Sequence, residues 1–197
     1  MNAPDLILAS ASPRRSELLR QLGVWHQVMI ANVTEQRAAG ETAEHCVRRL
    51  AEAKARAVTH TADMSLPVLG ADTAVVIDDH FLGKPSERVD ALNMLAQLSG
   101  RSHRVLTAVA LLHRASVEIA VSASIVTFRE LTRAECERYW ESGEPRDKAG
   151  AYAIQGLAAA FIVELRGSYS GVMGLPLFET AGLLRRAQVP MWQDVSQ

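Results

Sequence analysis

Four side chains near the N-terminus have the types and spacing needed to bind an anion. Arg14 and Arg15 fall in the first turn of a predicted helix, where the positive end of the helix dipole disfavours cations. Both would be accommodated if an anion bound at this turn, held by backbone N–H groups, by the hydroxyls of Ser10 and Ser12 and by the two guanidiniums. The alternative is that both arginines simply extend into water at a helix end, and charge alone does not decide between these interpretations.

Lys54 and Asp72 add a further candidate cation for anion binding and a candidate acid–base or metal-binding carboxylate. Lys54 lies on or beside the apolar stripe of a predicted helix, so either its stem covers core surface or its ammonium points into a cleft. Asp72 interrupts the most apolar strand-like run, residues 67–77, where a buried charge is costly unless it is paired or bound to a metal. Gly70, two residues earlier, leaves room for a ligand to approach, so Asp72 is a candidate metal ligand or general base. The alternative is a turn-forming aspartate between two shorter strands.

Three further polar residues complete the candidate set. Lys84 stands between a glycine and a proline, a constrained position for an ammonium, although it could equally be a surface turn. Glu35 lies in a polar loop, and Gln155 belongs to a small-residue-rich stretch, 147–156, where backbone can approach a ligand closely. Several cations with one or two carboxylates suit phosphoryl chemistry. From spacing alone this indicates, but does not assign, a phosphate-ester or nucleotide site.

Composition argues against several other classes of protein. The 197 residues are 48% hydrophobic and carry a net charge of −1, so nothing predicts general binding to nucleic acid or to an anionic membrane. Cys46 and Cys136 lie far apart in helix-like segments, which favours reduced packing thiols in a cytoplasmic protein. No apolar run approaches about 18 residues, and the N-terminus has neither a basic region nor a secretory core. Walker A, dinucleotide-binding, His-Glu-x-x-His and Cys-x-x-Cys motifs are absent.

Strand-like and helix-like segments alternate along the chain, and a long β-hairpin is expected in the middle. We expect strands at residues 6–9, 25–30, 67–77, 104–113, 117–129 and 161–165, and helices at 13–22, 42–60, 86–99, 132–142 and 177–187. Residues 167–171 are expected to form a loop. The pattern predicts an α/β fold, a mixed twisted sheet flanked by helices, in a single domain over residues 1–197.

Helix boundaries are marked by capping residues. Ser12, Ser86 and Thr132 are expected to cap three helices, the last with a capping box. Gly23 fits the end of the first helix. In the helix after Ser86, the residues expected to point inward are Val89, Leu92, Leu95, Ala96 and Leu98.

All of the candidate residues except Glu35 sit in motifs that resemble the Maf family of nucleoside triphosphate pyrophosphatases. The similarity runs in order over nearly the whole chain, through residues 10–19, 49–55, 70–73, 83–85, 147–152, 154–156, 167–169 and 172–176. It implies two lobes around a deep nucleotide-binding cleft and hydrolysis of a nucleoside triphosphate to the monophosphate and diphosphate. A homodimer is an expectation from the family alone, as is an inhibition of septum formation on overproduction. That last property leaves a regulatory or binding role, independent of catalysis, as an alternative.

Three positions discriminate between branches of this family. Arg14, Thr73 and Gln155 are similar to the branch acting on dTTP and UTP, whereas the branch acting on 7-methyl-GTP carries Trp, Gln and Glu there. Chemically, an amide can pair with an imide edge as both donor and acceptor. Modified pyrimidine triphosphates remain open as the physiological substrate.

The resemblance also implies roles for the candidate residues. Asp72 accepts the proton of the water that attacks the α-phosphorus. Glu35 helps Asp72 to hold a divalent cation, Mg²⁺ or Mn²⁺. The triphosphate is held by Ser10, Arg14, Arg15, Lys54 and Lys84.

Overall fold

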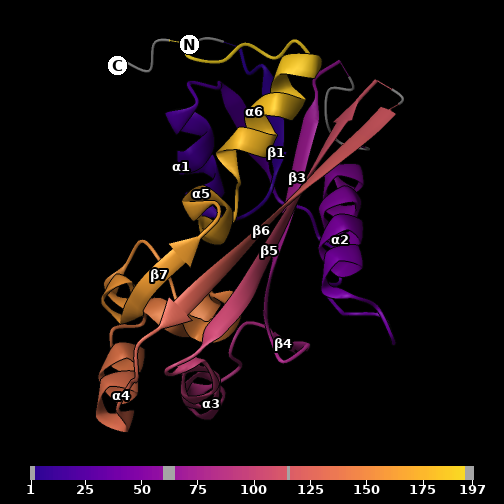
Figure 1. Ribbon diagram of the computed structural model, residues 1–197. Coiled ribbons are helices and arrows are strands. Elements are labelled where there is room, and N and C mark those ends of the chain that lie inside the picture. Colours follow the sequence, from indigo (N-terminus) through magenta and orange to yellow (C-terminus); the bar gives the residue numbers. More distant parts are fainter. Residues whose placement is uncertain (1–2, 60–64, 115, 194–197) are drawn as a thin grey trace. The chain divides into compact units, whose positions relative to one another are not determined.

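The protein is an α/β structure built on a mixed sheet (Figure 1). The computed structural model describes residues 3–59, 65–114 and 116–193. The strands are β1 (Leu6–Ala9), β2 (His26–Met29), β3 (Val68–Ile77), β4 (His80–Leu82), β5 (Ser102–His113), β6 (Ser116–Phe128) and β7 (Ile162–Arg166). Their order is β2-β1-β3-β5-β6-β7, with β4 paired to β3. β1 runs parallel to β2 and β3, while β4 and β7 are antiparallel to their partners, which confirms the predicted mixed sheet.

The structure contains the five predicted helices, with small shifts at their ends, and a further helix, α5, where a loop was expected. They are α1 (Pro13–Gln21), α2 (Ala43–Ala57), α3 (Arg88–Leu98), α4 (Arg133–Glu141), α5 (Tyr169–Met173) and α6 (Leu177–Arg186), with 3-10 turns η1 (Glu144–Asp147), η2 (Ala149–Ala151) and η3 (Leu157–Phe161). The expected loop at 167–171 is wrong in part, because α5 begins there. Ser168 closes that turn, since its hydroxyl accepts from Gly171 N at 3.0 Å. The predicted end of the second helix, His60, lies outside the described residues.

Of the three predicted helix caps, Thr132 is confirmed, Ser12 is confirmed in position but not in its side-chain bond, and Ser86 is wrong. Thr132 and Glu135 form the full capping box at the start of α4. Ser12 occupies the N-cap position of α1, but its hydroxyl makes no capping bond. Ser86 instead hydrogen-bonds the Asp90 carboxylate, so α3 starts two residues later, after Glu87. A nearby acid in the first turn thus competes with the helix N–H groups for the serine.

The chain divides into two compact units, each with its own core. Unit 1 comprises Met1–Asp72, Thr107–Ser122 and Gly174–Gln197, and unit 2 comprises Thr73–Leu106 and Ala123–Met173. In unit 1, Ile7 and Ala9 of β1 and Val68 of β3 pack against Ala55 of α2 and against Val58, which follows that helix. The cleft between two lobes that the resemblance implies stays a prediction.

The core of unit 2 is centred on aromatic rings. Phe128 makes edge contacts with Tyr152 at 4.9 Å and with Phe161 at 6.1 Å between ring centroids. Helix α3 contributes Ala91, Leu95 and Leu98. The expected inward positions of Val89 and Ala96 are wrong, because both side chains are exposed, Val89 by 56%. The buried stripe of α3 follows residues 91, 95 and 98, and Val89 and Ala96 lie off this stripe.

Candidate active site

The turn between β1 and α1 holds Arg15 in a fixed position. Its Nε donates to the carbonyl oxygen of Gly174 at 2.8 Å, and its Nη1 donates to Ser10 Oγ at 3.1 Å. The same Ser10 oxygen accepts from Ser12 N at 3.2 Å. Loss of hydration at the guanidinium lowers the pKa of Arg15, which the negative charge of Asp72 partly opposes. The interpretation that Arg15 simply extends into water is therefore wrong.

The backbone conformation of Gly174 allows its carbonyl oxygen to accept the hydrogen bond from Arg15. It has φ of +113°, a backbone region that residues with a Cβ rarely occupy. The resulting bend precedes α6 and presents the Gly174 carbonyl to Arg15. Arg14 is half-buried beside it, and its positive charge also lowers the pKa of Arg15.

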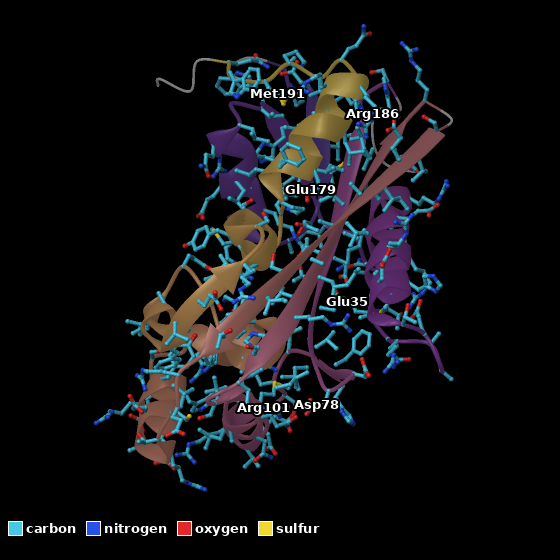
Figure 2. The ribbon with its side chains drawn as sticks, in the orientation of Figure 1. Glu35, Asp78, Arg101, Glu179, Arg186 and Met191 are labelled. Atoms are coloured by element: carbon cyan, nitrogen blue, oxygen red, sulfur yellow. The ribbon has the colours of Figure 1, made fainter. Side chains whose placement is uncertain are left out.

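Lys54 joins the two predicted acids of unit 1. Its Nζ donates to Asp72 Oδ1 at 2.7 Å and lies 2.5 Å from Glu35 Oε1. The side chains of Lys54 and Asp72 are 9% and 12% exposed, whereas that of Glu35 is 43% exposed. Figure 2 labels Glu35, which comes from the segment leading to α2. The ammonium is buried against two carboxylates and does not extend into water. The alternative, in which the stem of Lys54 covers core surface while the ammonium is solvated, is therefore wrong.

Close approach of α2 to β3 brings this lysine and this aspartate together. Asp72 lies inside one continuous strand, so the alternative of a turn between two shorter strands is wrong. Two residues earlier, a Cβ built on Gly70 would overlap the Ala51 carbonyl oxygen and lie 2.7 Å from Ala55 N. Glycine is therefore required where the helix backbone crosses the strand. In Figure 1, α2 accordingly runs alongside β3.

The electrostatic balance at Asp72 suits a proton acceptor. Burial raises the pKa of Asp72, whereas the charge and hydrogen bond of Lys54 and the charge of Arg15 lower it. The negative charge of Glu35 raises it again. A carboxylate held in this balance is more basic than one in water while it keeps cationic partners.

The acid pair also fits a divalent cation. The carboxylates of Glu35 and Asp72 converge on one positive charge, and such oxygens are the ligands that Mg²⁺ and Mn²⁺ prefer. Over residues 3–59, 65–114 and 116–193, no group of three or more His, Cys, Asp or Glu residues could hold a metal. Any further ligands would be phosphate oxygens and water, the usual arrangement for Mg²⁺ on a nucleotide.

The remaining predicted residues belong to unit 2. Thr73 follows Asp72 directly on β3 and is half-buried. Lys84 is exposed and lies just after β4. Gln155 is also exposed, and it lies in a turn that is closed by a hydrogen bond from Gly156 N to Ala153 O at 3.1 Å. The structure thus groups the predicted residues of unit 1, while the meeting of these three with Asp72 stays a prediction.

A comparison with known families bears on this geometry. A family model described as Maf-like protein matches residues 5–187. The chain belongs to the Maf family. Within the described residues of this Maf protein, no helix is long and apolar enough to cross a membrane.

Relatives of this Maf protein match it over nearly its full length. Proteins named dTTP/UTP pyrophosphatase from Saccharophagus degradans, Bordetella parapertussis and Alkalilimnicola ehrlichii are 51%, 53% and 53% identical to it. The matches cover 99%, 94% and 94% of this chain and 94% of each relative. The Ham1 protein of Staphylococcus aureus matches at 12% identity over 62% of this chain and 71% of that one, with a TM-score of 0.40, too low to bear on the fold.

Sequence reasoning missed three residues that support the Maf site residues. Gly174 lies in the family motif at residues 172–176, and its position shortly after the glycine-containing loop at 167–171 was the available signal. Tyr139 and Glu144 bind the backbone on either side of Gln155. Neither gave a signal, because a helical tyrosine and a glutamate before a proline are ordinary surface or core residues.

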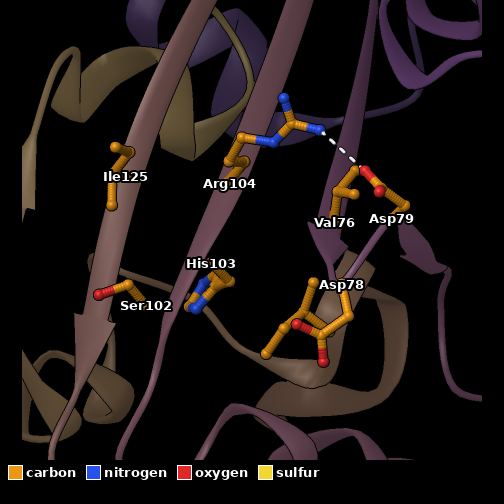
Figure 3. A pocket seen from close by; sticks show the side chains of 8 residues that line it. Val76, Asp78, Asp79, Ser102, His103, Arg104 and Ile125 are labelled. Atoms are coloured by element: carbon orange, nitrogen blue, oxygen red, sulfur yellow. Dashed lines mark ion pairs between the residues drawn. The ribbon is translucent and has the colours of Figure 1, made fainter.

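A hollow of about 330 Å³ in unit 2 has none of the predicted site residues in its lining (Figure 3). It is lined by Val76, Ile77, Asp78, Asp79, Ser102, His103, Arg104 and Ile125. Its acids are paired, since Asp79 lies 3.6 Å from Arg104 and Asp78 binds Arg101 at 2.7 Å. The acids that line this hollow are thus matched by arginines of the same unit.

Proposed function

We propose that this protein hydrolyses dTTP and UTP to the monophosphate and diphosphate, as a pyrophosphatase that removes nucleotides from the cytoplasmic pool. The cluster of Lys54, Asp72 and Glu35 carries the proposal, because it combines a buried base with cations in the same unit as the Ser10–Arg15 turn. The substrate is suggested by relatives that carry the name dTTP/UTP pyrophosphatase at 51–53% identity. Arg14, Thr73 and Gln155 are the pyrimidine-type residues of the family resemblance.

The reaction assigns Asp72 to proton transfer. A water oxygen forms a bond to the α-phosphorus as the bond from that phosphorus to the bridging β-oxygen breaks. Asp72 takes the proton of the water, and pyrophosphate leaves with the electron pair of the broken bond. Lys54 holds the carboxylate by a 2.7 Å hydrogen bond, so the base stays in one orientation.

Binding of the triphosphate falls to the cations. Arg15, fixed by Ser10 and Gly174, offers a charge that needs no reordering when the phosphates arrive. Arg14, Lys84 and the Ser12 turn complete the proposed contacts. Glu35 and Asp72 would hold Mg²⁺ or Mn²⁺, which when bound supplies positive charge to the phosphate oxygens as a Lewis acid.

The direct test is a Asp72→Asn variant assayed with Mg²⁺ or Mn²⁺ on UTP and dTTP. The parent protein should release pyrophosphate, and the variant should lose about 10²–10⁴-fold in kcat, the usual contribution of a general base. Asp78→Asn is the matched control, because Asp78 pairs with Arg101 at the surface, and it should keep its activity. Release of orthophosphate by the parent, or full activity of Asp72→Asn, would contradict the proposal. Rates on modified pyrimidine triphosphates, measured in parallel, identify the preferred substrate.

A further inference from the structure

Gln155 sits at the tip of a short turn whose two ends are bound by the same pair of side chains. Residues 153–156 form this turn, closed by the hydrogen bond from Gly156 N to Ala153 O at 3.1 Å. Gln155 is exposed, while its neighbour Ile154 is buried in the core of unit 2. The tip therefore presents an amide to its surroundings from an anchored backbone.

Tyr139 and Glu144 bind this backbone on both sides of Gln155. The Tyr139 hydroxyl accepts from Ala153 N at 3.1 Å and donates to Glu144 Oε1 at 2.7 Å. Beyond the tip, Glu144 Oε2 accepts from Leu157 N at 3.0 Å. One hydroxyl and one carboxylate, joined to each other, thus hold the residues that precede and follow the turn.

The pair is rigid and closely fitted. Tyr139 is 4% exposed and its ring makes an edge contact with Phe161 at 5.1 Å. Burial and the bond to Glu144 raise the pKa of Tyr139, so the hydroxyl stays a donor over the whole working pH range. A Cβ on Gly156 would overlap the Glu144 carboxylate, so the turn lies directly against it.

We infer that Tyr139 and Glu144 are positioning residues that set base specificity by holding the Gln155 turn. The inference rests on the proposed function, in which the Gln155 amide reads the imide edge of uracil or thymine. A guanine offers the amide the same donor and acceptor through its N1–H and O6, but its larger ring carries this edge farther from the sugar. Holding the Gln155 backbone at one distance and angle therefore favours uracil and thymine over guanine, because a misplaced hydrogen bond loses most of its strength.

The experiment compares Tyr139→Phe and Glu144→Gln with the parent enzyme on UTP, dTTP and GTP. Both variants keep side-chain volume and remove only hydroxyl or charge. We expect KM for UTP and dTTP to rise about tenfold, the preference over GTP to fall by a similar factor, and kcat to change less than about threefold. Inhibition by inorganic tripolyphosphate, which has no base, should be unchanged. Unaltered discrimination in both active variants would overturn the inference.

A matched control separates positioning from loss of stability. Thr132→Ala breaks the capping box of the same helix, α4, without touching the turn. It should lower Tm yet leave the preference for UTP over GTP intact. A fall in preference after Thr132→Ala equal to that of Tyr139→Phe would overturn the inference, since any loosening of α4 would then suffice.

A double-mutant cycle with Gln155 supplies the last test. Once Gln155→Ala has removed the amide, adding Tyr139→Phe should cause no further loss of discrimination. Additive losses would overturn the inference. If the parent enzyme hydrolyses no nucleoside triphosphate, the proposed function itself fails and this role fails with it, an outcome distinct from an active enzyme whose specificity ignores Tyr139 and Glu144.

Discussion

Lys54 controls both the charge balance of the acid cluster and the pKa of Asp72. Two carboxylates face its ammonium, and two of the three side chains in this cluster are almost completely buried. The lysine both satisfies Asp72 and restrains its pKa against the effect of burial. A buried pair of this kind adds little net stability, but removing one partner leaves an uncompensated charge.

Replacing Lys54 with methionine should therefore be costly in two ways. Without the ammonium, Asp72 and Glu35 repel each other, and the free energy of unfolding should fall by about 3 kcal/mol. The pKa of Asp72 should rise, because its principal cationic partner is lost, and the acid limb of the pH–rate profile should move to higher pH. Thermal unfolding and residual kcat/KM between pH 5 and pH 8 measure the two effects.

Arg48→Met is the control for that substitution. Arg48 lies on the same helix in an exposed pair with Glu44, 3.9 Å apart. A loss of no more than about 0.5 kcal/mol is expected there, with no shift of the pH–rate profile. Equal effects of the two substitutions would mean that Lys54 is an ordinary helix lysine.

At the scale of elements, the site depends on how closely a helix crosses a strand. Gly70 lets α2 approach β3 until the Ala51 carbonyl and the Ala55 amide fill the space of a Cβ. That approach places Lys54 on Asp72. The same contact joins Ala55 to Ile7 and Val68 in the core of unit 1, so the packing and the chemistry share one geometric requirement.

Gly70→Ala should push α2 away from β3. The added methyl group meets backbone atoms, which cannot rotate aside, so a loss of about 2–3 kcal/mol is expected, with a fall in Tm of roughly 5–10 °C. Activity should fall more than stability predicts, because the bond from Lys54 to Asp72 lengthens. Calorimetry and kcat/KM at a temperature where the variant is folded measure both.

Gly182→Ala provides the contrast within the same unit. Gly182 lies inside α6, and the atom nearest to its built Cβ is Arg186 Nη1 at 3.7 Å. Alanine is favoured over glycine in a helix by about 1 kcal/mol, so this variant should be as stable as the parent or more so. If Gly70→Ala behaved in the same way, the close approach would have no structural importance.

At the scale of the molecule, the sequence predicted the elements better than their contacts. The apolar run ending in Ile77, the capping box at Thr132 and the glycine after the first helix all have local causes, and each was confirmed. Ser86 was wrongly predicted to be a helix cap, because its hydroxyl binds the Asp90 carboxylate four residues later. Local patterns cannot rank such competitors.

The candidate site shows the same division. Lys54 and Asp72 could be singled out because each breaks an apolar pattern, yet their pairing depends on a crossing of α2 and β3 that no local pattern encodes. Tyr139 and Glu144 break no pattern, so only the fold connects them to Gln155. Residues that act through backbone contacts therefore stay invisible to sequence reasoning.

The last prediction concerns the response of the whole chain to acid. His103 is 2% exposed, its ring makes edge contacts with Phe128 and Tyr152, and its Nε2 lies 2.8 Å from the Tyr152 hydroxyl. Burial lowers its pKa from 6.5 to about 4. The unfolded chain thus takes up a proton below pH 6.5 that the folded chain refuses, and stability present above that pH is lost as the pH falls toward 4.

At about 1.4 kcal/mol per pKa unit, this gap corresponds to a loss of about 3 kcal/mol by pH 4. Urea unfolding from pH 7 to pH 4 should show it, and His103→Gln, which can still bind Tyr152 but cannot charge, should remove that part of the slope. The same substitution at the exposed His45 should leave the slope as in the parent. Parallel slopes for His103→Gln and the parent would mean that the buried imidazole accepts its proton in the folded state, with the aromatic core of unit 2 opening to water to allow it.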